Sequence, residues 1–389
     1  MSRRPIALSP DLRRLRDEGY DIDIRHGYLL IRDVPYVNDQ RAVQRGTLIS
    51  KLDLAGDTTE RPKDHVAHWT GEYPCHHTGE KIRAIENSAP NQTLAEGVHA
   101  DFMFSAMAPY TDYHHKMTTY IGRIAGEAEV IEPGVTAKTF PAIGEDDPEG
   151  VFKYVDTASS RAGIVPLAMK LAGQRIGIVG LGGTGAYILD LVAKTPVEEI
   201  HLFDADVFSQ HNAFRAPGAP TIEQLQAKPR KVAHLKAIYE NMRNGIVVHD
   251  TYLGEDNVGL LDNLDYCFVC MDTAAPKRHV VDRLIDRGVP FVEVGMGIDL
   301  TEQGLQGLVR VTACTPDTVE RARPHMSFSD GDVGNLYATN IQIAELNALN
   351  AALAVIHWKK HFGVYVDRGG AYYAGYSIPR GGIVIEGVE

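Results

Sequence analysis

The segment from residue 175 to residue 194 constrains the fold most, because an apolar run meets a glycine-rich turn that leads directly into a second apolar run. Glycine has no Cβ atom, so backbone N–H groups in such a turn can closely approach the phosphates of a nucleotide at the start of a helix. The pattern predicts a strand over 175–179, a helix over 186–194 and a phosphate-binding turn between them. The glycines of this turn are Gly180, Gly182, Gly183 and Gly185.

Composition narrows the classes of partner. A chain of 389 residues with 44% hydrophobic residues can bury a large core and suggests two or three domains. Its net charge of -12 argues against electrostatic binding to nucleic acid or to an anionic lipid surface. The first residues lack the apolar core of a signal peptide, and no later apolar run is long enough to span a bilayer. We therefore expect a cytoplasmic protein with neither nucleic acid nor a membrane as partner.

A change in composition marks a domain boundary. Residues 132–135 and 144–150 are rich in turn-forming residues and poor in apolar ones, and the second stretch is acidic. We expect residues 1–145 to form a smaller accessory α+β domain, whose detailed fold the sequence does not define. Residues 151–389 should form a second domain.

The second domain alternates apolar strands with helical segments, which is typical of an α/β fold with a Rossmann-like, doubly wound, mainly parallel sheet. A long apolar helix is expected over residues 340–360, followed by a terminal hairpin or edge strands over 364–388. The other expected strands are 199–204, 246–251, 266–271 and 291–294, and a further helix is expected over 229–243.

Charged residues follow the expected strands at the edge where a ligand of such a sheet binds. Asp204 and Asp206 end one strand on the same side, so that one carboxylate can hold a ribose and the other can order the loop. Taken alone, a glycine turn followed by Asp204 does not separate NAD from ATP. Arg215 and Lys231 add cations that a nucleoside triphosphate losing pyrophosphate needs, whereas hydride transfer does not. Asp272, after another apolar strand, is a carboxylate suited to Mg²⁺.

With these motifs in one order, residues from about 159 to 361 resemble the ThiF/MoeB/ubiquitin-activating superfamily of adenylating enzymes. The resemblance implies an ATP-dependent adenylyltransferase, with the glycine turn cradling phosphates and Asp272 binding Mg²⁺. The quoted motifs are Gly180-Leu-Gly-Gly-Thr-Gly185, Asp204-Ala-Asp206, Asn212-Ala-Phe-Arg215, Lys231 and Cys270-Met-Asp-Thr273. By motif position, Gly182 and Gly183 contact phosphates, Asp204 binds ribose, and Asn212, Arg215 and Lys231 hold phosphates.

The resemblance also implies a substrate and a partner chain. The substrate is the C-terminal carboxylate of a small ubiquitin-like or sulfur-carrier protein, which is joined to AMP. Family members deliver an arginine to the nucleotide across a dimer interface, and Arg161 occupies a similar place, so a homodimer is expected. The usual Arg-Gln pair is Arg215-Ala216 here, and the paired Cys-x-x-Cys motifs of many relatives are absent, so no zinc is expected.

Transfer beyond the adenylate depends on a cysteine. Cys314 lies in the region where relatives hold a catalytic cysteine, and four nearby basic residues could lower its pKa. It would then carry a thioester for transfer to a ubiquitin-conjugating type of enzyme. The alternative is that Cys314 ends a strand as a small packed residue. The nearby basic residues are Arg310, Arg321, Arg323 and His325.

Three other functions remain open on sequence alone. The first is adenylation of a sulfur-carrier protein for cofactor synthesis. The second is a non-catalytic scaffold with the same fold, and the third is an NAD-dependent oxidoreductase. In the accessory domain, the histidines near Cys75 match no zinc spacing, and scattered histidines are the favoured interpretation. This domain is expected to dock the protein substrate or a conjugating partner.

Overall fold

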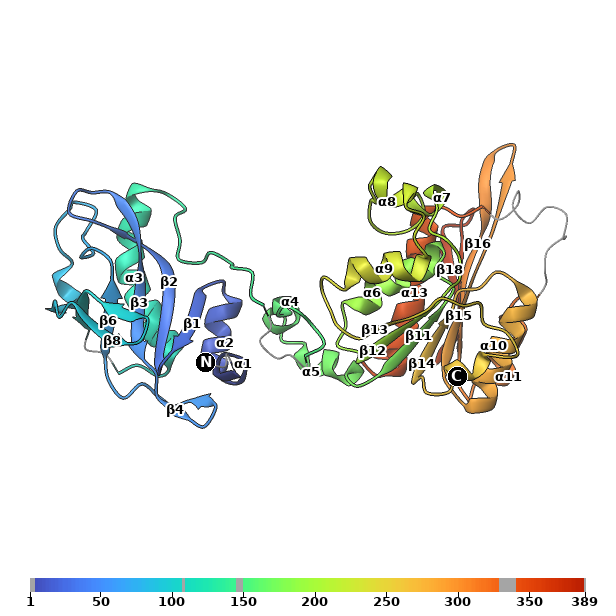
Figure 1. Cartoon of the computed structure of the whole chain (residues 1–389), viewed down its shortest axis with the longest axis horizontal. Coiled ribbons are helices and arrows are strands. Elements are labelled where there is room, and N and C mark those ends of the chain that lie inside the picture. The colour runs from blue at the N-terminus through green and yellow to red at the C-terminus, as the bar shows by residue number, and fades with distance from the viewer. Residues whose placement is uncertain (1–3, 107–108, 145–149, 329–340, 388–389) are drawn as a thin grey trace. The chain divides into compact units, whose positions relative to one another are not determined.

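The structure is a computed structural model that describes residues 4–106, 109–144, 150–328 and 341–387. The chain divides into two compact units, which are described separately (Figure 1). The first comprises residues 1–148 together with 155–162, and the second comprises 149–154 together with 163–389. Part of the acidic boundary segment, residues 145–149, lies outside the described residues.

The first unit is built on a six-stranded sheet in the order β1-β2-β3-β6-β10-β7, in which every pairing is antiparallel. The strands are β1 (Asp21–Arg25), β2 (Tyr28–Val37), β3 (Val43–Lys51), β6 (Val66–Thr70), β7 (Glu86–Ser88) and β10 (Phe102–Ser105). Two small hairpins join β4 (Leu54–Ala55) to β5 (Thr58–Thr59) and β8 (Gln92–Ala95) to β9 (Val98–Ala100). Its helices are α1 (Arg4–Leu8), α2 (Pro10–Asp17), η1 (Arg83–Ile85), α3 (Tyr113–Ile131) and α4 (Thr157–Arg161).

Helix α3 packs on the sheet of this unit and contacts β2. It starts at Asp112, whose side chain accepts a hydrogen bond from the backbone N–H of His115 at 2.7 Å and so caps the first turn. Tyr113, Met117 and Tyr120 recur at helical spacing and are buried among the aromatic side chains of the sheet. This helix and the antiparallel sheet confirm the smaller α+β domain.

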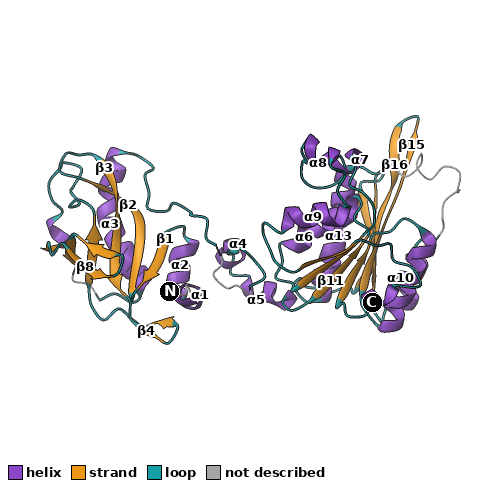
Figure 2. Ribbon diagram, in the orientation of Figure 1, coloured by secondary structure: helices purple, strands orange, loops and turns teal. Residues whose placement is uncertain are grey.

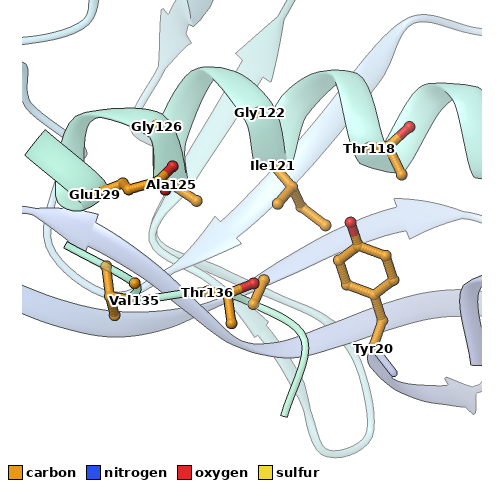
Figure 3. Close-up of a pocket in the computed structure, with 11 residues that line it drawn as sticks. Tyr20, Thr118, Ile121, Gly122, Ala125, Gly126, Glu129, Val135 and Thr136 are labelled. Atoms are coloured by element: carbon orange, nitrogen blue, oxygen red, sulfur yellow. The ribbon is translucent and has the colours of Figure 1, made fainter. Parts of the chain in front are cut away.

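An open hollow of about 300 Å³ runs along α3 (Figure 3). Small residues form much of its wall, and an added Cβ at Gly122 or Gly126 would meet no atom within 4 Å. Among the described lining residues, Glu129 is the one acidic or basic side chain.

The second unit contains an eight-stranded sheet in the order β13-β12-β11-β14-β15-β16-β17-β18. The neighbouring strands from β13 through β12, β11 and β14 to β15 pair in parallel. The remaining pairings, β15–β16, β16–β17 and β17–β18, are antiparallel. The strands are β11 (Arg175–Val179), β12 (Glu199–Phe203), β13 (Ile246–His249), β14 (Tyr266–Val269), β15 (Phe291–Thr301), β16 (Gly304–Cys314), β17 (Ala371–Ser377) and β18 (Gly382–Gly387).

Helices cover both faces of this sheet (Figures 1 and 2). Side chains from α6, α9 and α13 bury one face, and side chains from η3, α10 and α11 bury the other. The helices on the first face are α6 (Gly183–Ala193), α9 (Lys231–Tyr239) and α13 (Ala344–His361), and those on the second are η3 (Val258–Leu261), α10 (Ala274–Arg287) and α11 (Val319–Ala322). Short helices are α5 (Val165–Ala168), η2 (Met169–Leu171), α7 (Gln210–Ala213), α8 (Ile222–Gln226) and η4 (Arg323–His325).

This arrangement confirms the Rossmann-like, doubly wound sheet expected from the sequence. Strand β11 has the expected bounds, and α6 starts three residues earlier than expected, inside the glycine turn. The expected strand over 291–294 is only the start of β15, which continues into a long hairpin with β16. No described helix is both long and apolar enough to cross a bilayer.

Candidate functional site

Three of the four glycines in the turn between β11 and α6 are required by close packing. An added Cβ would lie 2.6 Å from the carbonyl oxygen of Cys270 at Gly180, 2.0 Å from Asn347 Nδ2 at Gly183 and 1.9 Å from a backbone carbonyl oxygen at Gly185. Gly180 also has a φ of +88°, which favours glycine. Gly182 differs, because a Cβ there would meet no atom within 4 Å. As the N-cap of α6, Gly182 leaves open space at the helix N-terminus, where an anion can approach.

The two carboxylates that follow β12 have different environments. Asp204 is 8% exposed and holds the site together, since it accepts hydrogen bonds from the backbone N–H of Leu181 at 2.7 Å and of Asp206 at 2.8 Å. The side chain of Asp206 is 49% exposed. Asp204 therefore orders the glycine turn and its own loop, while Asp206 is the carboxylate more accessible to a ligand.

Lys231, the first residue of α9, connects these carboxylates. Its Nζ lies 2.6 Å from Asp206 Oδ2 and 3.5 Å from Asp204 Oδ2. On the other side of Asp206, the Tyr252 hydroxyl donates a hydrogen bond to Oδ1. Burial raises the pKa of Asp206, but the hydrogen bonds from Lys231 and Tyr252 outweigh this effect and hold the pKa below its usual range.

Asn212 and Arg215 each have a buried hydrogen-bond donor without a partner among the described residues. Asn212 is 2% exposed, and its Oδ1 accepts from the backbone N–H of Ser209 at 2.8 Å, which fixes the amide as part of a capping box. Within the described part of the chain, Asn212 Nδ2 and Arg215 Nε are buried without a hydrogen-bond partner. Unpaired buried donors are costly, so a ligand that accepts hydrogen bonds, such as a phosphate, would stabilise both.

Asp272 lies in the turn between β14 and the start of α10, and its residue is exposed. Because β14 pairs in parallel with β11, Asp272 follows the same edge of the sheet as the glycine turn. Nowhere in residues 4–106, 109–144, 150–328 and 341–387 do three or more His, Cys, Asp or Glu side chains form a metal-binding group. An exposed carboxylate at this edge is nevertheless a suitable ligand for Mg²⁺, which is commonly held by one or two carboxylates together with phosphate oxygens.

Two of the residues expected in the site, Arg161 and Cys314, have surroundings unlike those of the side chains described above. Arg161 ends α4 in the first unit, where its guanidinium lies 5.5 Å from the centre of the Phe140 ring. Cys314 is the last residue of β16 and is 2% exposed. Burial raises the pKa of the Cys314 thiol to about 12. This is the packed strand end that the sequence offered as the alternative, and such a thiol is protonated at neutral pH.

Asn347 on α13 is a site residue that the sequence analysis missed. Its Oδ1 accepts from Thr184 Oγ1 at 2.9 Å, and its Nδ2 donates to the carbonyl oxygen of Arg215 at 3.3 Å. It therefore joins the glycine turn to the loop that carries Asn212 and Arg215. Asn347 is 1% exposed, and no feature of the local sequence distinguishes it from Asn350 on the same helix, which is also buried.

A buried ionic cluster was also missed. Glu293 on β15 is 0% exposed and pairs with Lys277 Nζ at 3.0 Å and with Arg310 Nη1 at 2.6 Å. Arg310 Nη1 also donates to the carbonyl oxygen of His325 at 2.7 Å. The cluster fixes the start of α10, and therefore the turn that carries Asp272, against the β15–β16 hairpin.

The fold is that of a Rossmann-like domain, and Asp204, Asp206 and Asp272 follow strands at the carboxyl edge of its sheet. Residues 160–363, more than half of the chain, match the ThiF family. The chain therefore belongs to the ThiF family, and this membership supports ATP-dependent adenylation in general. Residues 10–157 match a domain of unknown function, DUF6791.

Solved structures with a similar fold include MccB from E. coli with MccA-N7isoASN, with a TM-score of 0.45 and 15% identity over 58% of this chain and 66% of that chain. MccB from E. coli with ATP has a TM-score of 0.44 and 16% identity over the same shares. PaaA has a TM-score of 0.44 and 17% identity over 58% of this chain and 76% of its own. The match thus spans 66% of the MccB chain, and no curated protein matches this chain.

Proposed function

We propose that this protein adenylates the C-terminal carboxylate of a small ubiquitin-like protein with Mg-ATP. The observation that carries the proposal is the pair of buried donors without partners, Asn212 Nδ2 and Arg215 Nε, in the same unit as the open N-terminus of α6 at Gly182. Membership of the ThiF family supports ATP rather than NAD as the nucleotide.

In this proposal the nucleotide lies along the carboxyl edge of the sheet. The backbone of Gly182 and Gly183 contacts the phosphates, and Asp204 with Asp206 faces the ribose. Asn212, Arg215 and Lys231 bind phosphate oxygens. Asp272 would hold Mg²⁺, which supplies neutralisation of phosphate charge when it is bound.

The reaction needs no general base. A C-terminal carboxyl group has a pKa of about 3.5, so it is ionised at neutral pH. One carboxylate oxygen attacks the α-phosphorus and forms the acyl–phosphate bond, while the bond to the β-phosphate oxygen breaks and pyrophosphate leaves. The work of the protein is to align the carboxylate and to offset phosphate charge through Arg215 and Lys231.

We also propose that Arg161 reaches the nucleotide of a second copy in a homodimer. Its place upstream of the glycine turn, at the exposed end of α4, supports this role. Residues 1–145 would dock the protein substrate or a conjugating enzyme. The buried thiol of Cys314 favours a reaction that stops at the adenylate, and thioester formation would first require Cys314 to become exposed.

The test is ATP–pyrophosphate exchange with ubiquitin-like proteins encoded in the same genome. We expect one such protein to stimulate exchange, and Asp272→Asn to lower the stimulated rate about a hundredfold or more. Asp317→Asn, which changes an exposed carboxylate after β16, is the matched control and should exchange like the unchanged protein. Stimulation by a sulfur-carrier protein instead would assign the enzyme to cofactor synthesis. ATP binding without exchange for any candidate would favour a non-catalytic scaffold.

A further inference from the structure

Tyr252 is an exposed aromatic residue held at the nucleotide edge of the second unit. Its residue is 67% exposed, yet its hydroxyl is fixed by the hydrogen bond to Asp206 Oδ1. Asp206 Oδ2 in turn bonds Lys231 Nζ, which lies 3.5 Å from Asp204 Oδ2. Because that same Asp204 oxygen accepts from the backbone N–H of Leu181, a continuous chain of contacts connects the Tyr252 hydroxyl to the glycine turn.

The loop that carries Tyr252 is ordered by its own side chains. Asn257 Nδ2 donates to the carbonyl oxygen of Tyr252 at 2.9 Å and to Thr251 Oγ1 at 3.1 Å. Asn257 Oδ1 accepts from the backbone N–H of Gly254 at 2.8 Å. The loop therefore does not need the Tyr252 ring for its shape, and the ring is left available for a ligand.

The strand order places Tyr252 where a nucleobase would lie. Strands β11, β12 and β13 are parallel neighbours, so the segments that follow them lie side by side at one edge. These segments carry the glycine turn, Asp204 with Asp206, and Tyr252. Two strand spacings, about 10 Å, separate the first segment from the third, which suits a nucleotide running from phosphate through ribose to base.

We infer that the Tyr252 ring forms the wall on which the nucleobase stacks, while its hydroxyl fixes Asp206 beside the ribose. This inference rests on the proposed function, because it assumes that the glycine turn binds the phosphates. An aromatic face accepts any base, so Tyr252 contributes to affinity for the nucleoside part and discriminates little between ATP and GTP.

The test compares two ligands, ATP and inorganic tripolyphosphate, by equilibrium titration against the full chain. Tripolyphosphate has the phosphates but no nucleoside. We expect Tyr252→Ala to weaken ATP binding about fivefold or more and to leave tripolyphosphate binding unchanged. Tyr252→Phe keeps the ring and should lose less affinity for ATP than Tyr252→Ala. Tyr365→Ala removes another half-exposed ring of the same unit, 46% exposed, and should change neither affinity.

The outcomes separate this inference from the proposed function. If the unchanged protein binds ATP and Tyr252→Ala binds it equally well, the stacking role is wrong and the adenylation proposal stands. The same conclusion follows if Tyr252→Ala weakens the binding of ATP and of tripolyphosphate equally. The ring would then support the structure of the site and would not contact the base. If the unchanged protein binds neither ligand, the proposed function fails and the inference fails with it.

Discussion

Lys231 Nζ lies 2.6 Å from Asp206 Oδ2, so the lysine proposed to bind phosphate also holds a carboxylate of the ribose site. The side chain of Lys231 is 8% exposed and that of Asp204 is 7% exposed, and Lys231 is the cation nearest to both aspartates. Loss of the lysine would leave Asp204 buried without its cation. Lys231 thus has a structural role as well as a chemical one.

We therefore expect Lys231→Met to reduce two quantities together. Exchange should fall about a hundredfold, because one phosphate contact is lost. The free energy of unfolding of the second unit should also fall, since a buried carboxylate loses its partner. Urea unfolding followed by circular dichroism, run beside the exchange assay, measures both. Full stability in Lys231→Met would show that the ion pair does not support the fold.

Asp272→Asn should behave differently from Lys231→Met. Asp272 is exposed in a turn, so the amide should leave the unfolding midpoint within the error of the unchanged protein. The exchange rate should nevertheless drop about a hundredfold or more, because the metal would lose its protein ligand. Raising the Mg²⁺ concentration should recover part of the rate. A rate independent of both the substitution and Mg²⁺ would remove Asp272 from the metal role.

The glycine turn offers a matched pair of substitutions. Gly185→Ala places a Cβ 1.9 Å from the carbonyl oxygen of Gly180, so we expect a loss of stability of roughly 1–3 kcal/mol. Gly182→Ala meets no atom within 4 Å and should keep the fold. It should still weaken binding of ATP and of tripolyphosphate, because the methyl group occupies the space for phosphates. Unchanged binding in Gly182→Ala would place the phosphates elsewhere.

Cys314 provides a test of the route beyond the adenylate. Burial raises the pKa of its thiol to about 12, so alkylation by iodoacetamide at pH 7.5 should be slow in the folded protein and fast after unfolding. Cys314→Ser should retain ATP–pyrophosphate exchange. A substrate adduct that resists reducing agent would agree with the buried thiol. An adduct sensitive to reducing agent and lost in Cys314→Ser would instead establish a thioester.

In the first unit, Glu127 on α3 should respond to acid. Burial opposes ionisation of Glu127, but hydrogen bonds from His76 and His77 outweigh this effect and lower its pKa from 4.5 to about 2. A lowered carboxyl pKa stabilises the folded state above pH 4.5, and this contribution is lost as the pH falls from about 4.5 to about 2.

The corresponding variant is Glu127→Gln. We expect it to be less stable than the unchanged protein at pH 6, with the difference shrinking toward pH 2. Glu129→Gln, an exposed position on the same helix, is the control and should show no such pH-dependent difference. Denaturant unfolding at several pH values measures these differences. A constant difference for Glu127→Gln across the range would contradict the assigned pKa.

The parts of the second unit that were predicted from the sequence are those with local signals. Strand β11 is an apolar run beside a glycine turn, and alternation placed both aspartates at the end of β12. The β15–β16 hairpin was not predicted, because glycines interrupt its apolar pattern and much of its length is exposed. The hairpin is stabilised by pairing between the two strands, and the sequence of one strand alone does not reveal its partner.

The residues proposed for the site were named from the sequence because they follow strand ends or belong to the quoted motifs. Asn347 bonds Thr184 across 163 positions of the chain, and such a long-range contact leaves no mark on the local sequence pattern. The burial of Cys314 likewise depends on packing by α10 and α11, which lie on either side of it in the chain. The nearby arginines suggested electropositive surroundings for the Cys314 thiol, but Arg310 forms an ion pair with Glu293.

In the proposed reaction, this protein joins a C-terminal carboxylate to AMP, and the product can be observed on the protein substrate itself. The most direct measurement incubates the full chain with Mg-ATP and the ubiquitin-like protein that stimulates exchange, and then determines the intact mass of that protein. We expect a mass increase of one adenylate, which should be absent in Asp272→Asn and when the C-terminal carboxylate is amidated. An unchanged mass with pyrophosphate release, or an adenylate that also forms on the amidated protein, would contradict adenylation of the C-terminal carboxylate.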